Sequence, residues 1–350
     1  SPEVNEKNLE TSLNEKENKN KSKNEITLDV LNKEEKLAEN KILLEIPEEL
    51  KIKEILLPDD TVIEEKIEEY AVHKNGKYKF VFTLEDNSKI EKEIEINNLL
   101  KLVEEEKKPT YISECFEYLT GTVDTGYVIT DQYGNEFVWV PVESGILTRK
   151  NSKKSNYAEK ESSAKALVNS VAKNYGFYIS RYEAGKAELE NNIIAVSFKG
   201  IVPWYNATYK EALGKSEEFC SNFGYNDVSS DLVSSYAWDT TLKWIDSHEK
   251  SYSSSLEYGN YSDEIKLTGE TEKDCVNNIC DMAGNLKEWT TELYLGKNEE
   301  NNTTKKEKEN TNLRVIRGGC VNLKKSASSN ISFAEDLTDN YWGFRIILYK

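Results

Sequence analysis

The segment DMAGNLKEWT, residues 281–290, carries the residue types and spacing best suited to chemistry in this chain. A carboxylate opens it at Asp281, the pair Gly284-Asn285 favours a turn, and a second carboxylate follows at Glu288. An acid, a tight turn and a second acid are consistent with a metal-binding loop, with a catalytic loop or with an ordinary buried turn. The rest of the sequence has to distinguish these three interpretations.

Histidine and cysteine are sparse. The two histidines, His73 and His248, lie far apart in the sequence, which argues against a histidine-rich metal centre. Five cysteines are an odd number and too few for a disulfide framework; they are Cys115, Cys220, Cys275, Cys280 and Cys320. Cys275 and Cys280 are close enough in sequence to pair, but nothing in the sequence requires a disulfide.

The charge of the chain excludes one class of partner. A net charge of -17 over 350 residues argues against nucleic acid, because phosphate binding needs a clustered basic surface. An acidic surface instead attracts cations such as calcium. No window approaches the ~18 apolar residues of a membrane span, so no membrane insertion is expected. No signal peptide is recognisable, which fits both a chain without its targeting segment and a cytosolic chain.

Composition divides the chain into four parts. Residues 1–24 are polar, charged and aperiodic, which predicts a disordered stalk. Residues 25–98 contain short alternating segments, clearest in GKYKFVFTLEDNSKIEKEIEIN, and predict a small immunoglobulin-like β-sandwich. This part resembles the spacer domains of Gram-positive surface proteins. Residues 99–112 form a linker, and residues 113–350 hold all six tryptophans and predict a large, loop-rich domain.

Some elements of this large domain can be predicted. A β-hairpin is expected at 127–142 and a strand at 176–185. The segment ESSAKALVNSVAKNYG predicts a helix. A second, amphipathic helix is expected at 208–224, with a capping box formed by Thr208 and Glu211. The polar segment 296–312 predicts a mobile loop.

Six motifs, taken in chain order, point to a family: FVWVPV, FYISRYEAG, VPWYNATYKEA, DMAGNLKEWTTE, RVIRGGC and YWGFRIILY. Their order and spacing resemble the sulfatase-modifying-factor family. That family includes the formylglycine-generating enzymes and many non-catalytic bacterial and phage surface proteins. The resemblance covers residues 113–350 and is most specific in the last three motifs together. It implies an α+β domain with a C-type-lectin-like fold, here preceded by the small all-β sandwich.

The resemblance implies that the opening segment wraps a calcium ion, which takes six to eight hard oxygen ligands. Trp289 would pack behind the loop. The alternative is a buried turn in which the aspartate caps local N–H groups and the glutamate pairs with an arginine. One departure concerns Lys287, which stands where family members usually carry an aromatic residue; its ammonium weakens the ion's binding or points into solvent. The implied ligands are the side chains or carbonyls of Asp281, Gly284, Leu286 and Glu288.

Two further motifs are expected to be structural. Glycine permits close backbone approach or a positive φ, which suits Gly318 and Gly319. Phe344 is expected in the core. The two arginines, Arg317 and Arg345, are expected to pair with buried carboxylates, and Glu183 and Glu288 are the candidate partners.

The resemblance does not extend to the family's catalytic residues. The formylglycine-generating enzymes carry a cysteine pair after the Gly-Gly that binds copper, and a linear Cu(I) site needs two thiolates. This chain has one cysteine there, Cys320, where the family usually has a serine. The ergothioneine-type enzymes of the family need a three-histidine iron site, which two scattered histidines cannot form. No nucleophile elbow accompanies His248. We therefore expect no copper or iron centre and no enzymatic activity.

The sequence thus predicts a secreted or cell-surface protein that binds a ligand without catalysis, as an adhesin or receptor does. A glycan or protein ligand would contact the surface between Arg317 and Gly343, where aromatic and amide side chains offer stacking and hydrogen bonds. The residues expected to contact it are Asn322, Tyr341 and Trp342, unless Trp342 is simply core. The alternative is a structural tip or decoration subunit of a pilus, phage or surface assembly. An oxidase of the formylglycine-generating type is the less favoured reading.

Overall fold

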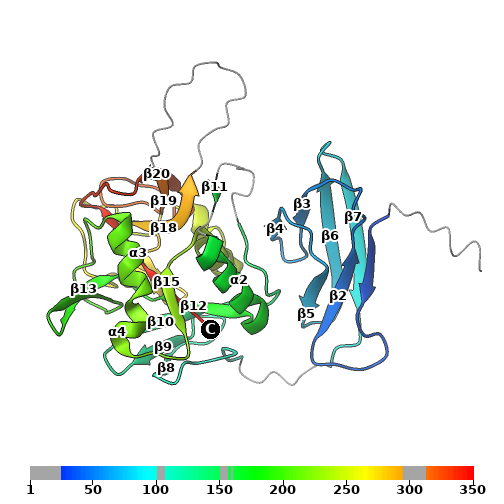
Figure 1. Cartoon of the computed structure of the whole chain (residues 1–350), viewed down its shortest axis with the longest axis horizontal. Helices are drawn as coiled ribbons and strands as arrows, with labels where there is room; N and C mark the ends of the chain where they lie inside the picture. Colours follow the sequence, from blue (N-terminus) through cyan, green and yellow to red (C-terminus); the bar gives the residue numbers. More distant parts are fainter. Residues whose placement is uncertain (1–24, 101–106, 150–156, 159–160, 295–312) are drawn as a thin grey trace, which may run out of the picture. The chain divides into compact units, whose positions relative to one another are not determined.

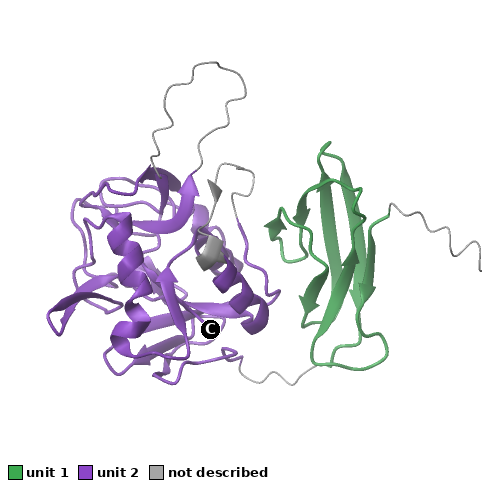
Figure 2. Ribbon diagram, in the orientation of Figure 1, with its two compact units in different colours: residues 1–102 green, residues 103–350 purple. Residues whose placement is uncertain are grey.

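A computed structural model of the chain describes residues 25–100, 107–149, 157–158, 161–294 and 313–350. The predicted stalk (1–24) and the predicted polar loop (296–312) lie outside these residues. The chain forms two compact units, residues 1–102 and residues 103–350 (Figure 2). In the described part, no helix is both long enough and apolar enough to cross a membrane.

The first unit consists of two antiparallel sheets (Figure 1). The sheets pack face to face through buried aromatic and aliphatic side chains, and the rings of Tyr70 and Phe80 lie 5.4 Å apart across the interface. One sheet has the order β1 (Thr27–Val30), β2 (Asn40–Glu45), β5 (Glu69–Val72). The other has the order β4 (Val62–Ile63), β3 (Ile52–Leu56), β6 (Gly76–Leu84), β7 (Lys89–Ile96).

The hairpin β6–β7 follows from its sequence. Alternation along β6 buries Phe80 and Phe82 completely while Lys79 stays exposed. The turn contains Asn87 with φ 66°, a conformation that asparagine tolerates. The first unit is thus all-β as predicted, and its immunoglobulin-like type stays a prediction.

The second unit is built on two larger sheets (Figure 1). The six-stranded sheet has the order β15 (Ser229–Leu232), β22 (Ile346–Tyr349), β12 (Gly176–Ser180), β10 (Glu136–Pro141), β9 (Val128–Asp131), β8 (Phe116–Thr120). The other has the order β11 (Tyr157–Ala158), β18 (Lys287–Tyr294), β19 (Leu313–Arg317), β20 (Asn330–Ala334), and β21 (Trp342–Gly343) pairs in parallel with β18. Two small hairpins are β13 (Gly185–Leu189) with β14 (Asn192–Val196) and β16 (Cys275–Val276) with β17 (Ile279–Cys280).

Four helices accompany these sheets in the described residues: α2 (Glu161–Asn174), α3 (Tyr209–Glu217), α4 (Phe219–Phe223) and α5 (Ser235–His248). Two short 3-10 turns follow, η1 (Tyr252–Ser254) and η2 (Glu272–Asp274). The expected capping box of Thr208 and Glu211 is present at the start of α3. The predicted single helix is interrupted at Glu218, so that α3 and α4 are separate elements.

The other local predictions can be compared directly. The expected hairpin at 127–142 is β9–β10. The expected strand at 176–185 ends already at Ser180, because the chain then leaves the six-stranded sheet to begin β13 at Gly185. Helix α5 was not expected.

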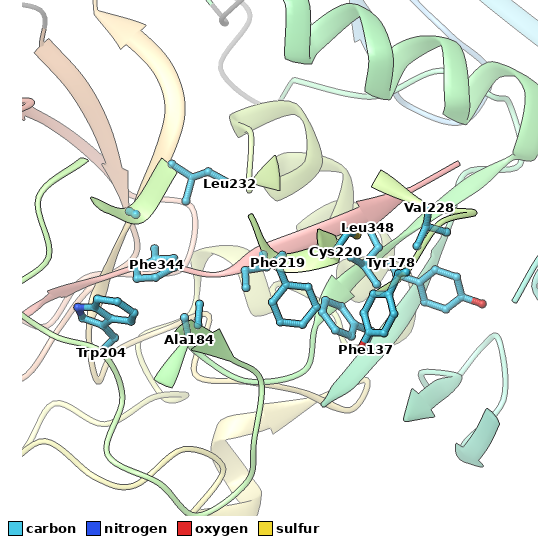
Figure 3. Packing of buried hydrophobic residues seen from close by; sticks show 14 of the residues in the cluster. Phe137, Tyr178, Ala184, Trp204, Phe219, Cys220, Val228, Leu232, Phe344 and Leu348 are labelled. Atoms are coloured by element: carbon cyan, nitrogen blue, oxygen red, sulfur yellow. The ribbon is translucent and has the colours of Figure 1, made fainter. Parts of the chain in front are cut away.

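The core of the second unit lies on both sides of the six-stranded sheet, in two clusters of buried hydrophobic residues. Figure 3 shows part of the first, in which Phe137, Tyr178 and Phe219 pack together. The rings of Phe137 and Phe219 lie 5.4 Å apart at a steep angle, the edge-to-face arrangement that aromatic pairs prefer. The second unit, residues 103–350, is called the head below. The predicted fold class, an α+β head preceded by a small all-β part, is confirmed.

Candidate functional site

Residues 281–286 form a tight, buried loop between β17 and β18. Three of its residues have left-handed backbone conformations: Asp281 (φ 61°), Gly284 (φ 82°) and Asn285 (φ 57°). A Cβ on Gly284 would lie 2.6 Å from the backbone nitrogen of Asn260, so this position requires glycine. The loop is therefore held against the segment around Asn260.

The side chain of Asn285 is the hub of this loop. It is fully buried. Its amide nitrogen donates to Glu183 Oε2 at 2.6 Å, and its oxygen accepts from Asn260 Nδ2 at 3.0 Å and from the backbone N–H of Lys266 at 2.9 Å. The backbone N–H of Leu286 donates to the other oxygen of Glu183 at 3.0 Å. Asn285 thus ties the loop to two other segments, a role that the sequence did not reveal.

Glu288 forms a bidentate ion pair with Arg345. The guanidinium donates from Nε to Oε2 at 2.7 Å and from Nη2 to Oε1 at 2.6 Å. It also donates to the carbonyls of Ser180 at 3.1 Å and Cys280 at 2.9 Å. Both side chains of the pair are completely buried. This is the fork geometry in which arginine binds carboxylates best.

Three buried carboxylates therefore share one guanidinium. Burial raises the pKa of Asp281 to about 7, opposed by the Gly269 N–H and by Arg345. Burial also raises the pKa of Glu183 well above its ordinary value, and the neighbouring Asp281 adds to the effect. Asp281 accepts one long hydrogen bond, 3.3 Å from the backbone N–H of Gly269. The cluster has more acidic groups than cationic ones, which favours either protonation or a bound cation.

The chemistry of these donors suits a hard cation. Calcium takes carboxylate and carbonyl oxygens, which are the groups that the loop offers. Each Glu288 oxygen keeps a lone pair beyond the one that accepts from Arg345. Among the described residues, no three His, Cys, Asp or Glu side chains converge closely enough to hold a metal ion, so a cation would also need carbonyls such as those of Gly284 and Leu286. Calcium stays a prediction.

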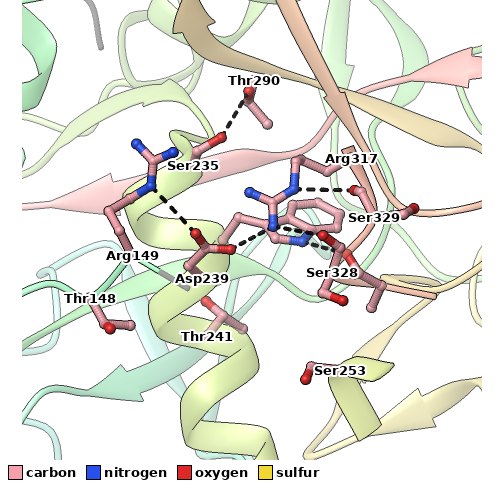
Figure 4. Close-up of polar contacts among 12 residues, drawn as sticks. Thr148, Arg149, Ser235, Asp239, Thr241, Ser253, Thr290, Arg317, Ser328 and Ser329 are labelled. Carbon is pink, nitrogen blue, oxygen red and sulfur yellow. Dashed lines mark hydrogen bonds and ion pairs between the residues drawn. The ribbon is translucent and has the colours of Figure 1, made fainter. Parts of the chain in front are cut away.

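Arg317 has a different partner from those expected. It pairs with Asp239 of helix α5, with Nη2 to Oδ1 at 2.5 Å (Figure 4). Arg149 lies on the other side of the same carboxylate at 3.4 Å and also pairs with Glu292. Arg317 further donates to the carbonyl of Ser329 at 3.3 Å. The expectation that Glu183 or Glu288 would pair with Arg317 is wrong, because α5 brings a closer carboxylate.

The glycines and aromatic residues of these motifs lie in close packing. Gly318 has φ 77°, and a Cβ on Gly319 would lie 2.5 Å from the carbonyl oxygen of Lys325. Phe344 and Trp289 are fully buried. The indole N–H of Trp289 donates to the Ala207 carbonyl at 2.8 Å, and its ring packs against that of Trp342.

A cavity of about 540 Å³ lies beside the loop. Its lining comprises buried residues, aromatic rings of which Phe333 and Tyr341 are half-buried and Trp342 is buried, and exposed residues of the segment 322–339. The lining residues are Lys287, Cys320, Val321, Asn322, Leu323, Phe333, Leu337, Thr338, Asp339, Tyr341 and Trp342. The tertiary structure thus brings the start of β18, the segment after β19, strand β20 and the segment before β21 to one site.

All three residues predicted to contact a ligand line this cavity. Asn322 is exposed at the rim and has φ 63°. Tyr341 is half-buried. Trp342 is only 7% exposed and packs against Phe333, with ring centres 4.4 Å apart. Trp342 therefore belongs to the core and lines the cavity at once.

Lys287 and Cys320 are among the cavity residues that were not predicted as site residues. Lys287 is 6% exposed and lines the cavity, so most of its side chain is shielded from solvent. Cys320 is 3% exposed. The signal for both was present in the sequence, since each departs from the residue that the resemblance led us to expect.

The cysteines occupy different environments, and all five are described. Cys275 and Cys280 are joined by a disulfide across the hairpin β16–β17, which decides the question that the sequence left open. Cys115, Cys220 and Cys320 are free. Of these, Cys320 alone lines the cavity.

Comparison with known proteins shows which family model and which solved structure this chain resembles. The family model described as the sulfatase-modifying factor enzyme 1-like domain matches residues 204–350. The solved structure of PvdO from Pseudomonas aeruginosa aligns with 70% of this chain and 100% of its own, with a TM-score of 0.38 and 12% sequence identity. No curated protein matches the chain. The matched residues contain the loop, the Arg-Gly-Gly motif and the cavity. Residues 204–350 of this chain therefore match the sulfatase-modifying factor enzyme 1-like domain.

Proposed function

We propose that this chain is a secreted or cell-surface protein that binds a glycan or protein ligand through its head domain and catalyses no reaction. The cavity of about 540 Å³ carries the proposal. Its volume lies in the range of small-ligand sites. Asn322, Tyr341 and Trp342, which the sequence identified as ligand contacts, all line it.

The lining supports a binding role. The aromatic walls, Phe333, Tyr341 and Trp342, offer stacking area, and Asn322 and Thr338 offer hydrogen bonds at the rim. Mixed aromatic and amide surfaces are common in protein recognition sites. This combination suits a ligand that is partly apolar and rich in hydroxyl or amide groups.

The cavity also supports a non-catalytic reading. A linear Cu(I) site needs two thiolates, and Cys320 is the one cysteine among the lining residues. The other free cysteines, Cys115 and Cys220, belong to other parts of the head. An oxidation assay on a sulfatase-derived cysteine peptide, with copper added, tests this directly. Formation of the aldehyde product would overturn the non-catalytic reading.

The disulfide of Cys275 and Cys280 supports an exported protein. Disulfides form and persist outside the reducing cytosol. Labelling of intact source cells with an antibody against the chain tests the location, and a signal confined to permeabilised cells would contradict it.

The ligand is sought with a glycan array and a whole-cell binding screen of the full chain, each with calcium and with chelator. Binding to a defined glycan or cell surface is the expected result. It should be lost when Tyr341 is replaced by alanine, because that change removes a wall of the cavity. An absence of binding in every arm would favour the structural-subunit alternative, whose partner is another protein of an assembly.

We propose that the loop binds calcium. This proposal leads to a separate prediction. Adding millimolar calcium to chelated protein should raise the melting temperature of the head. A ligand at 100 times its Kd stabilises the folded state by about 2.7 kcal/mol, which for a domain of this size corresponds to roughly 5–10 °C.

The matched control for this prediction is Asp281→Ala, which removes one of the two implied carboxylate ligands and should abolish the shift. Magnesium should be a poor substitute, because it demands a stricter octahedral geometry. If calcium produces no shift in the wild-type chain, the loop is a buried turn stabilised by Asn285 and Arg345.

A further inference from the structure

Lys287 occupies an unusual position at the floor of the cavity. It is the first residue of β18, and its side chain is 6% exposed. Successive strand residues point to opposite faces. Glu288 accordingly turns inward to Arg345, whereas Lys287 lines the cavity.

The ammonium of Lys287 has no partner within the described residues. No described carboxylate forms an ion pair with it, and no hydrogen bond to its Nζ is found. Lysines this buried are usually paired, so the cavity that Lys287 lines is the place from which a counter-charge could approach its ammonium.

The positive charge of the Lys287 ammonium influences another residue of the cavity. Burial raises the pKa of the Cys320 thiol, and the positive charge of Lys287 opposes that effect. Cys320 lines the same cavity. A negative group entering the cavity would therefore meet a cation that has no carboxylate partner among the described residues.

The shape of the ammonium determines how selective it is between anionic groups. An ammonium is a compact point charge without the planar fork of arginine. It can therefore donate to a carboxylate or to a sulfate group without a strong geometric preference. Lys287 would therefore select the anionic group of a ligand by its charge and not by its geometry.

The walls and rim indicate what carries the charge. Aromatic rings at Phe333, Tyr341 and Trp342 can stack on the apolar faces of a sugar ring, and Asn322 and Thr338 can pair with its hydroxyls. The one acid of the lining, Asp339, is exposed at the rim and accepts the Tyr341 N–H at 2.9 Å. Its charge is screened by solvent there, and its oxygens can also accept sugar hydroxyls.

We propose that the cavity binds an anionic saccharide, either carboxylated or sulfated, and that Lys287 at its floor pairs with the anionic group. The inference rests on the proposed ligand-binding function and names the ligand class. It also assigns a specificity-determining role to a lysine that stands where the family usually has an aromatic residue.

Titration calorimetry of the full chain tests the proposal with four probes: 3′-sialyllactose, lactose 6′-sulfate, lactose, and a short peptide rich in glutamate. We expect the two anionic sugars to bind and lactose to bind at least about 10-fold more weakly, the effect of losing one charge-assisted hydrogen bond. The variant Lys287→Met should reduce the affinity for the anionic sugars by about 10- to 100-fold, to the level of lactose.

Two controls separate recognition from folding. Lys324→Met removes an exposed lysine that does not line the cavity and should leave all affinities unchanged. Lys287→Met itself should not lower the melting temperature without ligand, because methionine fills a similar space and the change breaks no ion pair found among the described residues. Should this variant prove unstable, Lys287→Gln, which keeps a polar group of similar length, replaces it.

The outcomes are distinct. Loss of anionic-sugar binding in the Lys287 variants alone would support the proposal. Equal affinity for lactose and the anionic sugars, or binding that does not depend on Lys287, would overturn it while leaving the proposed function intact. Lys287-dependent binding of the acidic peptide in place of the sugars would overturn the saccharide class. If none of the four probes binds, this inference fails, and the proposed function is then decided by the glycan and whole-cell screen.

Discussion

Replacing Arg345 by methionine should destabilise the head domain by about 3–5 kcal/mol, the cost of breaking a buried ion pair from one side. The guanidinium is fully buried and makes two hydrogen bonds to Glu288 and two to the backbone carbonyls of Ser180 and Cys280. Without it, the carboxylates of Glu183, Asp281 and Glu288 lose their shared counter-charge. Because whole domains are stable by about 5–15 kcal/mol, the variant should unfold at a much lower denaturant concentration.

Denaturant unfolding followed by tryptophan fluorescence measures this effect in the full chain. All six tryptophans lie beyond residue 113, so the signal reports on the head and is silent for the first unit. Lys210→Met is the matched control, because the ion pair of Lys210 with Glu335 is solvent-exposed on the lysine side. Such a pair contributes at most about 1 kcal/mol.

A double variant tests the physical reason. Glu288→Met combined with Arg345→Met removes both charges of the pair, and it should be more stable than Arg345→Met alone. If the single variant costs no more than the Lys210 control, the pair of Glu288 and Arg345 does not hold the loop in place.

The second large effect is expected from Trp289→Ala. The indole is fully buried, its N–H donates to the Ala207 carbonyl at 2.8 Å, and its ring centre lies 5.3 Å from that of Trp342. Truncation of a buried tryptophan costs about 3–5 kcal/mol. Because Trp342 lines the cavity, the change should also weaken ligand binding, whereas Lys287→Met weakens binding without loss of stability.

The conservative partner of this variant is Trp289→Phe. It keeps an aromatic ring and loses the hydrogen bond to Ala207, so it should cost about 1–3 kcal/mol, less than the alanine variant. Circular dichroism gives the unfolding curves independently of the altered tryptophan content. Equal stability of the wild type and both variants would show that the ring does not support the loop.

Some of this architecture could be read directly from local sequence. The alternation around Phe80 and Phe82 predicts a hairpin, and Thr208 with Glu211 predicts a helix start. Both features depend on residues a few positions apart, whose geometry local propensity decides. The turn at Gly284-Asn285 belongs to the same class.

Helix α5 escaped prediction for a physical reason. Most of its residues are buried, including polar ones such as Asp239 and Thr241. A helix buried on most of its circumference shows no clear apolar stripe, and that stripe is the signal on which sequence interpretation depends. The partner of Arg317 was missed for the same reason, because Asp239 lies on this helix.

The sequence by itself determined some of the elements, the order of the motifs and the resemblance that the family model over residues 204–350 bears out. It also predicted Asn322, Tyr341 and Trp342 as ligand contacts, and all three line the cavity. Only the tertiary structure decided which buried charges pair and which remain unpaired. Lys287 and Glu288 are adjacent in sequence, yet one faces a cavity and the other an arginine 57 residues away. Burial and pairing depend on strands and loops brought together from distant parts of the chain, and no local pattern encodes that information.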